Sequence, residues 1–459
     1  MPPKKPRPKG EHRQSRPARN RSQSAQRPTK VLRAGNRKPS RGGKVEAVTF
    51  AGLLKPLIPA STKPQATALQ YSSPLAHLDY DEELTIKNQG LALFWQQFKL
   101  PGTPEPVTAS PRRRRYRTTS KRKAILKGNS LYLLFNDRAL RTQKKPFVAS
   151  PLEPQGHGRI YEFLQKKISE PPFKMVAAHL NYLIIRGSYE EHAVIFNVDT
   201  LNGSLVRKLK IIAEHLQKFY PKVTAAYIYP AADSEYYLEE RQPADLLHFK
   251  RLFGKTDLVA THHPCRYFYH PTSFSQVNES MVPKMLEIAK ELLAPLPGEH
   301  LLDLYCGYGL FSHFLAPAYK QVLGIDGEGP SIRSAISNKK VNPASKNSRF
   351  LARKLTEQSV EEIPFPTRQA VESILLDPPR LGPARGVIDA LAQRNPRQVL
   401  HIHCGVDQIP TSIEQWQQNG YQVTRIVPLD MFPGSANLEV LILFTQKAPE
   451  DNGNNSQPD

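Results

Sequence analysis

The alternation of short apolar runs with amphipathic stretches after residue 273 constrains the fold more than any other feature of the sequence. Such alternation is typical of a Rossmann-like, doubly wound and mostly parallel sheet with helices on both faces. In that α/β architecture ligands bind at the carboxyl ends of the strands. The expected strands are Leu301–Tyr305, Val322–Ile325, Ser373–Leu376, Val399–His403, Gln422–Val427 and Val440–Phe444. The expected helices are Ser280–Leu293, Pro330–Lys339, Ala384–Arg394 and Thr411–Asn419.

Composition divides the rest of the chain into further segments. Residues 1–45 are a low-complexity Lys/Arg/Pro/Ser tail that we expect to be disordered, because it has almost nothing to bury. We interpret residues 46–109 as a linker that is partly helical near Glu82–Phe98. Residues 110–270 are predicted to be a smaller α+β domain, residues 271–446 the α/β domain, and residues 447–459 a second disordered tail. The elements expected in the α+β domain are strands Leu131–Phe135, Met175–Arg186 and Ala193–Val198, and helices Arg159–Lys166 and Gly203–Phe219.

The positive charge is concentrated in two places. Residues 1–45 hold 15 Lys/Arg against the single acid Glu11, which gives +14, and residues 112–127 hold nine Lys/Arg and no acid, which gives +9. Because the whole chain carries +23, the remainder is formally neutral. Two basic regions on a neutral body indicate a polyanionic partner, most simply nucleic acid. A solubilising or targeting tail remains an alternative for residues 1–45.

The three cysteines, Cys265, Cys306 and Cys404, are too few and too widely spaced for several kinds of site. They exclude a disulfide framework, a four-cysteine zinc site and a cysteine-ligated iron–sulfur cluster, so we expect neither a metal nor a cluster. A reducing, intracellular location fits, namely the cytoplasm, or the nucleus or nucleolus in a eukaryote. No apolar run approaches the ~20 residues of a membrane span, and the sequence indicates no obligate protein partner.

Three motifs follow three of the expected strands. Gly307 and Gly309 form a turn that lets the backbone approach a ligand closely. Asp326 ends the next strand, where nucleotide-binding folds hold ribose hydroxyls, although it could equally cap a helix. Asp377 is followed by two prolines and Arg380, which fix a rigid loop. In this order the motifs predict S-adenosylmethionine as the cofactor.

Two further residues at strand ends suggest covalent chemistry. Cys404 follows the strand Val399–His403, and Glu439 precedes Val440–Phe444. A thiolate can add to an electron-poor carbon, and a carboxylate can remove a proton from the adduct. In isolation, however, a cysteine at a strand end is usually a small buried apolar residue. A glutamate before an edge strand is usually only solvated.

The segment from Gln276 to Phe444 resembles the RNA uracil-C5 methyltransferase family. The matching pieces are Phe274–Asn278, Leu302–Gly307, Gly324–Asp326, Leu376–Arg380, His403–Cys404, and Met431–Pro433 followed by Glu439. The resemblance implies that Gln276, Tyr305, Asp326 and Asp377 contact S-adenosylmethionine. It also implies that Cys404 attacks carbon 6 of a uracil and that Glu439 accepts the proton from carbon 5. The matched glycine turn makes Gly307 and Gly309 part of the cofactor site.

The resemblance makes RNA the expected partner, either tRNA or rRNA. Arg115 and Arg117 would bind phosphates, Tyr116 would stack on a base, and Arg380 would contact the RNA beside the reacting base. A solvated charged loop is the alternative for residues 115–117. We expect the target uridine to be flipped out of its stack into the crevice between the two predicted domains.

The sequence departs from the family pattern at several positions, which keeps rival functions open. Gly405 and Val406 replace the usual Asn-Pro after the nucleophile, and Leu310 replaces a polar residue in the glycine turn. Cytosine-C5 methylation is disfavoured because no cysteine follows Pro379, and amino-group methylation because Arg380 replaces an aromatic residue. A non-catalytic RNA-binding or RNA-folding protein that retains the fold remains the alternative from another class.

Overall fold

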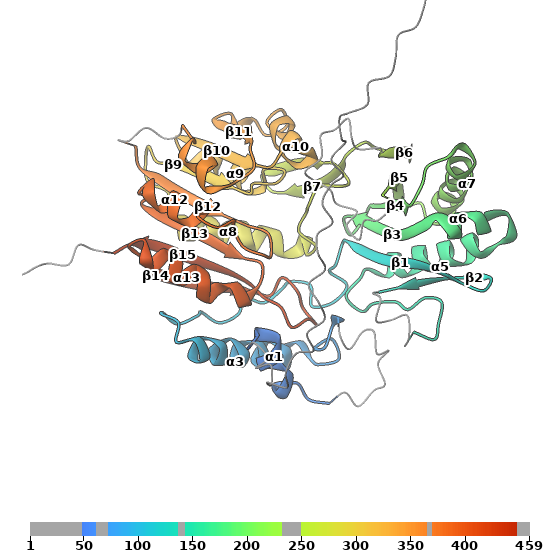
Figure 1. Cartoon of the computed structure of the whole chain (residues 1–459), viewed down its shortest axis with the longest axis horizontal. Helices are drawn as coiled ribbons and strands as arrows, with labels where there is room; N and C mark the ends of the chain where they lie inside the picture. The colour runs from blue at the N-terminus through green and yellow to red at the C-terminus, as the bar shows by residue number, and fades with distance from the viewer. Residues whose placement is uncertain (1–47, 61–71, 136–142, 232–248, 365–369, 448–459) are drawn as a thin grey trace, which may run out of the picture. The chain divides into compact units, whose positions relative to one another are not determined.

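The computed structural model describes residues 48–60, 72–135, 143–231, 249–364 and 370–447 (Figure 1). The tail predicted at residues 1–45 lies outside these ranges, and so does all but the first residue of the tail predicted at residues 447–459. None of the helices within them combines the length and the apolar character that crossing a bilayer requires.

A seven-stranded sheet with the order β11-β10-β9-β12-β13-β15-β14 forms the C-terminal part. Neighbouring strands are parallel from β11 to β13, whereas β15 runs antiparallel to both β13 and β14. The predicted doubly wound α/β fold is therefore confirmed, with all six expected strands present. Ser348–Ala352, at the sheet edge, was not predicted because it begins with two polar residues and its apolar run is only three residues long. The strands are β9 (His300–Leu304), β10 (Gln321–Asp326), β11 (Ser348–Ala352), β12 (Glu372–Leu376), β13 (Gln398–His403), β14 (Tyr421–Leu429) and β15 (Glu439–Gln446).

Both faces of this sheet are buried, as expected for parallel strands covered by helices. Successive residues of a strand point to opposite faces, so Leu301 packs with α8 and α9 while Leu302 packs with α12 and α13. The helices that follow the strands are α8 (Val282–Leu293), α9 (Leu310–Leu315), α10 (Pro330–Asn338), α11 (Glu357–Glu361), α12 (Val387–Gln393) and α13 (Ile409–Gln418).

Part of the segment interpreted as a linker packs into the core of this α/β domain. Phe50 of α1 (Phe50–Leu54) and Phe94 of α3 (Tyr80–Phe98) are buried in the same cluster as Trp416 and Phe444. The helix expected at Glu82–Phe98 is therefore present, and it is a packed element of the domain rather than a spacer. The exact domain boundaries stay a prediction.

A second sheet, of six strands in the order β2-β1-β3-β4-β5-β6, lies in the central part of the sequence. Only β4 and β5 are parallel, and α5 and α7 share its core. The strand expected at Met175–Arg186 was wrong in its first half, which forms the short helix α6. The elements are β1 (Ser120–Lys127), β2 (Ser130–Leu134), α5 (Gln155–Ser169), α6 (Lys174–His179), β3 (Leu180–Gly187), β4 (His192–Val198), α7 (Gly203–Phe219), β5 (Val223–Pro230) and β6 (Lys250–Phe253). A hairpin of β7 (Leu258–His262) and β8 (Cys265–Tyr269) leads back to the α/β domain.

Candidate functional site

The topology of the large sheet brings Asp377, Cys404 and Glu439 to one edge. Asp377 and Cys404 follow the carboxyl ends of the parallel strands β12 and β13. Because β15 is antiparallel, its first residues lie beside the end of β13, with Val440 opposite His403. The ligand atoms of the three side chains all lie within 4.8 Å of one another. The fold thus brings Asp377, 27 positions before Cys404, and Glu439, 35 positions after it, next to the same thiol.

The three groups strongly affect one another's ionisation. Burial, followed by the nearby carboxyl groups of Asp377 and Glu439, raises the pKa of the Cys404 thiol far above its usual range. Burial also raises the pKa of Glu439 to about 8, with a further increase from Asp377 and an opposing effect of Arg380. The pKa of Asp377 is raised to about 7, again mainly by burial. The pKa values of the two carboxyl groups therefore lie near neutral pH, as is common for catalytic acid–base groups.

The cysteine is held directly against the Asp-Pro-Pro-Arg loop. Its Sγ lies 3.7 Å from Oδ1 of Asp377 and 3.7 Å from the carbonyl oxygen of Pro378, and the thiol donates to both. Oε1 of Glu439 is buried and has no hydrogen-bond partner among the described residues. A buried carboxylate oxygen without a partner is costly, which indicates that a bound molecule completes the site.

Arg380 lies at the exposed rim of this cluster. Its guanidinium carbon is 6.0 Å from the centre of the Phe432 ring. The positive charge lowers the pKa of Glu439 and of Cys404. Arg380 is therefore placed to tune the reacting groups as well as to meet a ligand that enters from solvent.

The glycine turn is built around the carboxylate of Asp326. Oδ2 of Asp326 accepts a hydrogen bond from the backbone N–H of Gly307 (2.7 Å), and Oδ1 accepts one from Gly327 (2.6 Å). Tyr305, Gly307 and Gly309 all have positive φ angles, of 61°, 56° and 84°. A Cβ at Gly307 would have no atom within 4 Å, whereas one at Gly309 would lie 2.8 Å from Cδ2 of His313. Gly307 therefore faces open space, and Gly309 is needed for packing.

Tyr308 and Leu310, which follow the two glycines of this turn where the family usually has polar residues, pack into the core. Tyr308 is buried and stacks on Tyr269 with ring centres 5.2 Å apart. Leu310 begins α9, is buried, and accepts a hydrogen bond at its carbonyl oxygen from the hydroxyl of Tyr267. Their apolar packing explains why polar residues are absent from these positions.

Asp303 is a site residue that the sequence analysis missed. It lies in β9, fully buried, and burial raises the pKa of its carboxyl to about 7. Oδ2 accepts a hydrogen bond from Ser312, but Oδ1 has no partner among the described residues. The signal was an acid inside the apolar run Leu301–Leu304. Two orphaned carboxylate oxygens, here and on Glu439, thus lie at the carboxyl edge of the sheet.

Gln276 occupies a different place from the Cys404 cluster. It is buried and lines a small cavity together with Tyr269 and Tyr308, behind the glycine turn. The segment is anchored by Arg186, whose guanidinium donates to the carbonyl oxygens of Pro271 and Ser273. It also pairs with the basic run, because the N–H of Thr118 donates to the carbonyl oxygen of Val277.

The residues predicted to bind RNA differ in their accessibility. Arg115 is exposed, and Arg117 is half-buried. Tyr116 is fully buried, so the expectation that its ring stacks on a base needs correcting. The basic run also supplies structural ion pairs, since Arg122 is buried against Glu153 at 2.6 Å and Arg114 pairs with Glu83 at 2.9 Å. The exposed cations that remain are Arg112, Arg113, Arg115 and Lys121.

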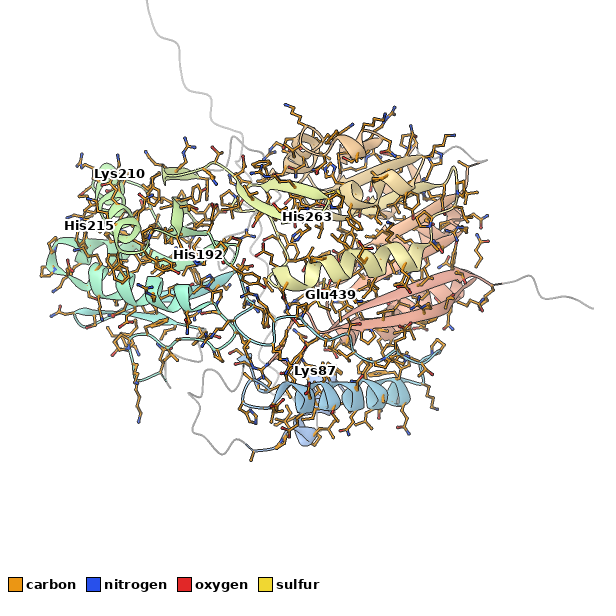
Figure 2. The ribbon with its side chains drawn as sticks, turned by 180° about the vertical axis from the view of Figure 1, so that it is seen from behind. Lys87, His192, Lys210, His215, His263 and Glu439 are labelled. Atoms are coloured by element: carbon orange, nitrogen blue, oxygen red, sulfur yellow. The ribbon has the colours of Figure 1, made fainter. Side chains whose placement is uncertain are left out.

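A buried ion-pair network supports the loop that leads to Glu439. Lys87 of α3 bonds Glu83 and Asp430, each at 2.7 Å, with all three side chains fully buried (Figure 2). Its ammonium also donates to the carbonyl oxygen of Phe432, and Glu83 accepts from the N–H of Gly434 at 2.5 Å. Residues 430–434 therefore depend on helix α3 for their conformation.

The site was tested against two kinds of bound group. The thiol and two carboxyl groups of Cys404, Asp377 and Glu439 are spaced closely enough to ligate a metal ion, although the sequence favoured none. An adenosyl cofactor fits the other half of the site. Backbone faces open space at Gly307, and the acids Asp326 and Asp377 stand at the ends of β10 and β12, the two strands that flank β9. That pattern is what a nucleoside bound across the strand ends requires.

Comparison with known proteins gives a consistent result. Residues 238–447 match the family model described as tRNA (uracil-5-)-methyltransferase. A 23S rRNA (uracil(1939)-C(5))-methyltransferase of Marinomonas sp. (strain MWYL1) is 34% identical over 182 residues, which are 40% of each protein. The same enzyme of Vibrio campbellii is 26% identical over 409 residues, covering 85% of this chain and 84% of the relative. The match to the Marinomonas enzyme spans well under half of that enzyme's length.

A solved structure has the same fold over most of the chain. The tRNA (uracil-54, C5)-methyltransferase of Pyrococcus abyssi, determined in complex with S-adenosyl-L-homocysteine, superimposes with a TM-score of 0.62. The match covers 83% of this chain and 87% of that one, at 21% identity. At this identity the similarity establishes the fold.

Proposed function

From the match of residues 238–447 to the tRNA (uracil-5-)-methyltransferase family model, we propose that the chain belongs to this family and that the protein methylates carbon 5 of a uridine in RNA. The observation that carries the proposal is the meeting of Cys404 and Glu439. Their Sγ and carboxylate oxygen lie within 4.8 Å of each other although they stand on different strands. A nucleophile and a general base that act on the same nucleobase ring must lie this close to each other.

The cofactor half is assigned to residues around the glycine turn. Tyr305, Gly307, Gly309, Asp326 and Asp377, with Gln276, would hold S-adenosylmethionine. When bound, this cofactor supplies an electrophilic methyl group on sulfur. Asp326 also fixes the turn itself through Gly307, so one carboxylate both shapes the loop and faces the ligand side. The orphaned Oδ1 of Asp303 supports a ligand or water on that side.

The chain's own residues then perform the steps on the uracil. The thiol proton of Cys404 passes to Asp377, whose Oδ1 is 3.7 Å away. The thiolate would add to carbon 6, and the electron pair of the carbon 5–carbon 6 bond would move to carbon 5. The bond to the methyl group would form there while the methyl–sulfur bond of the cofactor breaks and its electron pair stays on that sulfur. Glu439 accepts the proton of carbon 5, the double bond re-forms, and the bond between sulfur and carbon 6 breaks. The thiolate recovers its proton from Asp377.

The remaining contacts concern the RNA. The exposed arginines 112, 113 and 115 and Lys121 would bind phosphates, and Arg380 would lie beside the reacting base. The name of the family model refers to tRNA and the names of the two relatives to 23S rRNA. Nucleoside mass spectrometry of tRNA and rRNA from a deletion strain, with and without the restored gene, separates the two.

The decisive test uses RNA that contains 5-fluorouracil, whose fluorine cannot leave as a proton. In the presence of S-adenosylmethionine a denaturation-resistant protein–RNA adduct should form with the wild type. It should form equally with Cys265→Ala, which removes a buried cysteine in β8, and should vanish with Cys404→Ala. An adduct in Cys404→Ala would overturn the nucleophile assignment. No adduct with the wild type would favour the non-catalytic RNA-binding alternative.

A further inference from the structure

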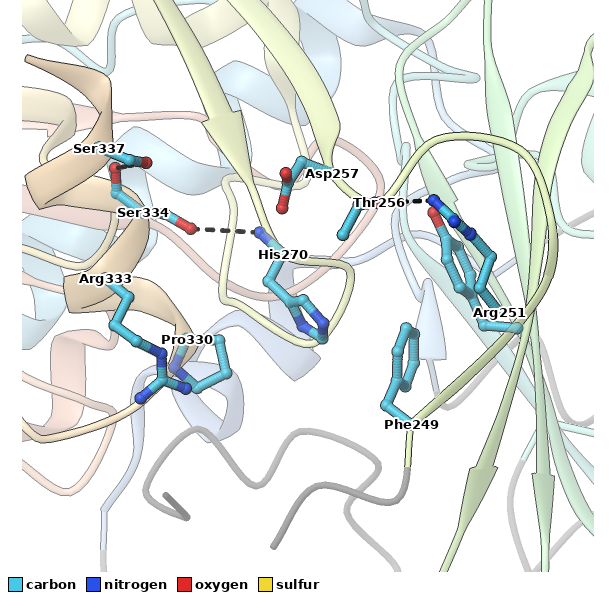
Figure 3. Close-up of a pocket in the computed structure, with 10 residues that line it drawn as sticks. Phe249, Arg251, Thr256, Asp257, His270, Pro330, Arg333, Ser334 and Ser337 are labelled. Carbon is cyan, nitrogen blue, oxygen red and sulfur yellow. Dashed lines mark hydrogen bonds between the residues drawn. The ribbon is translucent and has the colours of Figure 1, made fainter. Parts of the chain in front are cut away.

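A second cavity, of about 510 Å³, lies outside the Cys404 cluster (Figure 3). One wall comes from the six-stranded sheet and the loop after it, including Tyr227 and Arg251. The other comes from α10, including Pro330 and Arg333, and from His270 after β8. Because α10 follows β10, which ends at Asp326, this cavity adjoins the element that carries the predicted ribose-binding acid.

The α10 wall is firmly fixed. The side chain of Asn338 donates to the carbonyl oxygen of Phe268 and accepts from its N–H, at 3.0 and 2.8 Å. Asn342 makes the same pair of bonds with Arg266, at 2.7 and 3.0 Å. The N–H of His270 donates to Ser334 at 3.3 Å. Strand β8 and helix α10 therefore move as one unit, so the cavity has a preformed side.

The cavity has an aromatic lining. Phe249 stacks on Tyr227 with ring centres 4.8 Å apart, and it meets His270 at the same distance with an interplanar angle of 60°. Figure 3 shows the ring of His270 beside that of Phe249, on the lining of the cavity. Burial lowers the pKa of His270 to about 4, so its ring is neutral at physiological pH. Flat, uncharged rings of this kind provide stacking surfaces for a nucleobase.

Charged groups surround these rings. Arg251 and Arg333 stand on opposite walls, the first bonded to Thr256 at 2.8 Å and the second to Glu328 at 2.6 Å. Asp257 lies between them, half-buried, and forms no ion pair among the residues that the structure describes. Guanidinium groups bind phosphates, and a carboxylate oxygen pair accepts two adjacent N–H donors. Guanine is the nucleobase that presents two such donors on one edge.

We propose that this cavity binds an unpaired guanosine, stacked on Phe249, held at its base edge by Asp257 and at its phosphate by Arg251 or Arg333. The proposal that this guanosine belongs to the RNA substrate rests on the proposed function. The same chemistry would suit a free guanine nucleotide, and the experiment below separates the two sources.

The binding arm of the experiment titrates the full-length protein with GMP, AMP, CMP and UMP. GMP should bind at least ~10-fold more tightly than the others, since two hydrogen bonds to a carboxylate are specific to guanine. Asp257→Asn should abolish the preference, and Phe249→Ala should weaken GMP binding. The matched controls are Glu287→Gln at an exposed position of α8 and Leu201→Ala on an exposed loop, and they should change neither the preference nor the affinity. Equal affinity for all four nucleotides, or an unaltered preference in Asp257→Asn, overturns the assignment.

The catalytic arm measures methyl transfer to RNA from cells that lack the gene. Phe249→Ala should raise KM for RNA by about 5- to 100-fold, the range produced by losing one base–aromatic stack, with kcat unchanged. No transfer by the wild type would overturn the proposed function, independently of GMP binding. Transfer by the wild type with an unchanged KM in Phe249→Ala would overturn the RNA role alone. GMP binding together with that unchanged KM would assign the cavity to a free guanine nucleotide.

Discussion

Lys87 and Asp430 form an ion pair of 2.7 Å between side chains that are both fully buried, although 343 positions separate them in the sequence. The pair joins helix α3 to the loop 430–434, and Glu83 completes it from the same helix. A segment that precedes the family match thus holds the loop that runs toward Glu439. The contact gives residues 80–98 a definite part in shaping the site.

Replacing Lys87 by Met should strongly destabilise the protein. The variant leaves Asp430 as a buried carboxylate without its cation, while Glu83 keeps its ion pair with Arg114. Breaking a buried pair costs about 3–5 kcal/mol. Urea unfolding followed by circular dichroism measures the change. Lys210→Met is the matched control, because Lys210 faces Glu214 at 4.0 Å on an exposed surface of α7 and should cost less than ~1 kcal/mol. Equal losses in both variants would contradict the structural role of the buried pair.

Replacing Asp377 by Asn should make the Cys404 thiol more reactive while it impairs methyl transfer. The Asp377 carboxyl raises the pKa of Cys404, so its removal lowers that pKa and increases the thiolate fraction at a given pH. Iodoacetamide alkylation of Cys404 at pH 8, followed by mass spectrometry, should be faster in the variant. Asp389→Asn, at an exposed position of α12, should leave the rate unchanged. Slower alkylation in Asp377→Asn would contradict this prediction and would show that the Asp377 carboxylate helps to deprotonate the Cys404 thiol in the free enzyme.

The rate of product release from the covalent adduct should rise with pH and level off above about 8. Glu439 accepts a proton only as a carboxylate, and burial raises its pKa to about 8, so the active form is lost as pH falls through that value. Arg380→Gln should move the midpoint to higher pH, since Arg380 lowers the pKa of Glu439. Quenched single-turnover reactions from pH 6 to 10 measure both profiles.

Glu439→Gln provides the corresponding kinetic test. Loss of a general base typically slows proton transfer by about 10²–10⁴-fold, so the adduct with ordinary uridine RNA should accumulate on denaturing gels. Turnover at the wild-type rate, or a pH profile in the variant identical to that of the wild type, would remove Glu439 from the base role.

The sequence predicted the large sheet well because its strands are apolar runs bounded by polar turns. Cys404 and Glu439 were predicted from strand-end positions and from the family resemblance, and their roles stay predictions. Tyr116 could not be judged correctly, because a tyrosine within a basic run gives no sign that its ring is buried. The Lys87 network was equally hidden. A lysine four residues after a glutamate reads as a surface pair on a helix, and only the tertiary contact with Asp430 shows otherwise.

The glycine turn allows the cofactor contact to be separated from packing. Gly309→Ala should destabilise the protein by about 1–3 kcal/mol, because φ is +84° and the new Cβ meets His313 at 2.8 Å. Gly298→Ala has φ +80° and open space around the Cβ. It should therefore lose only the stability that the positive φ costs an alanine, about 1–2 kcal/mol. Gly307→Ala also faces open space at φ +56°, so its unfolding should resemble that of Gly298→Ala. Its affinity for S-adenosylmethionine, measured by calorimetry, should nevertheless fall at least ~10-fold, because the methyl group blocks close approach to the backbone. If Gly307→Ala binds the cofactor as tightly as Gly298→Ala does, the turn shapes the fold without contacting the ligand.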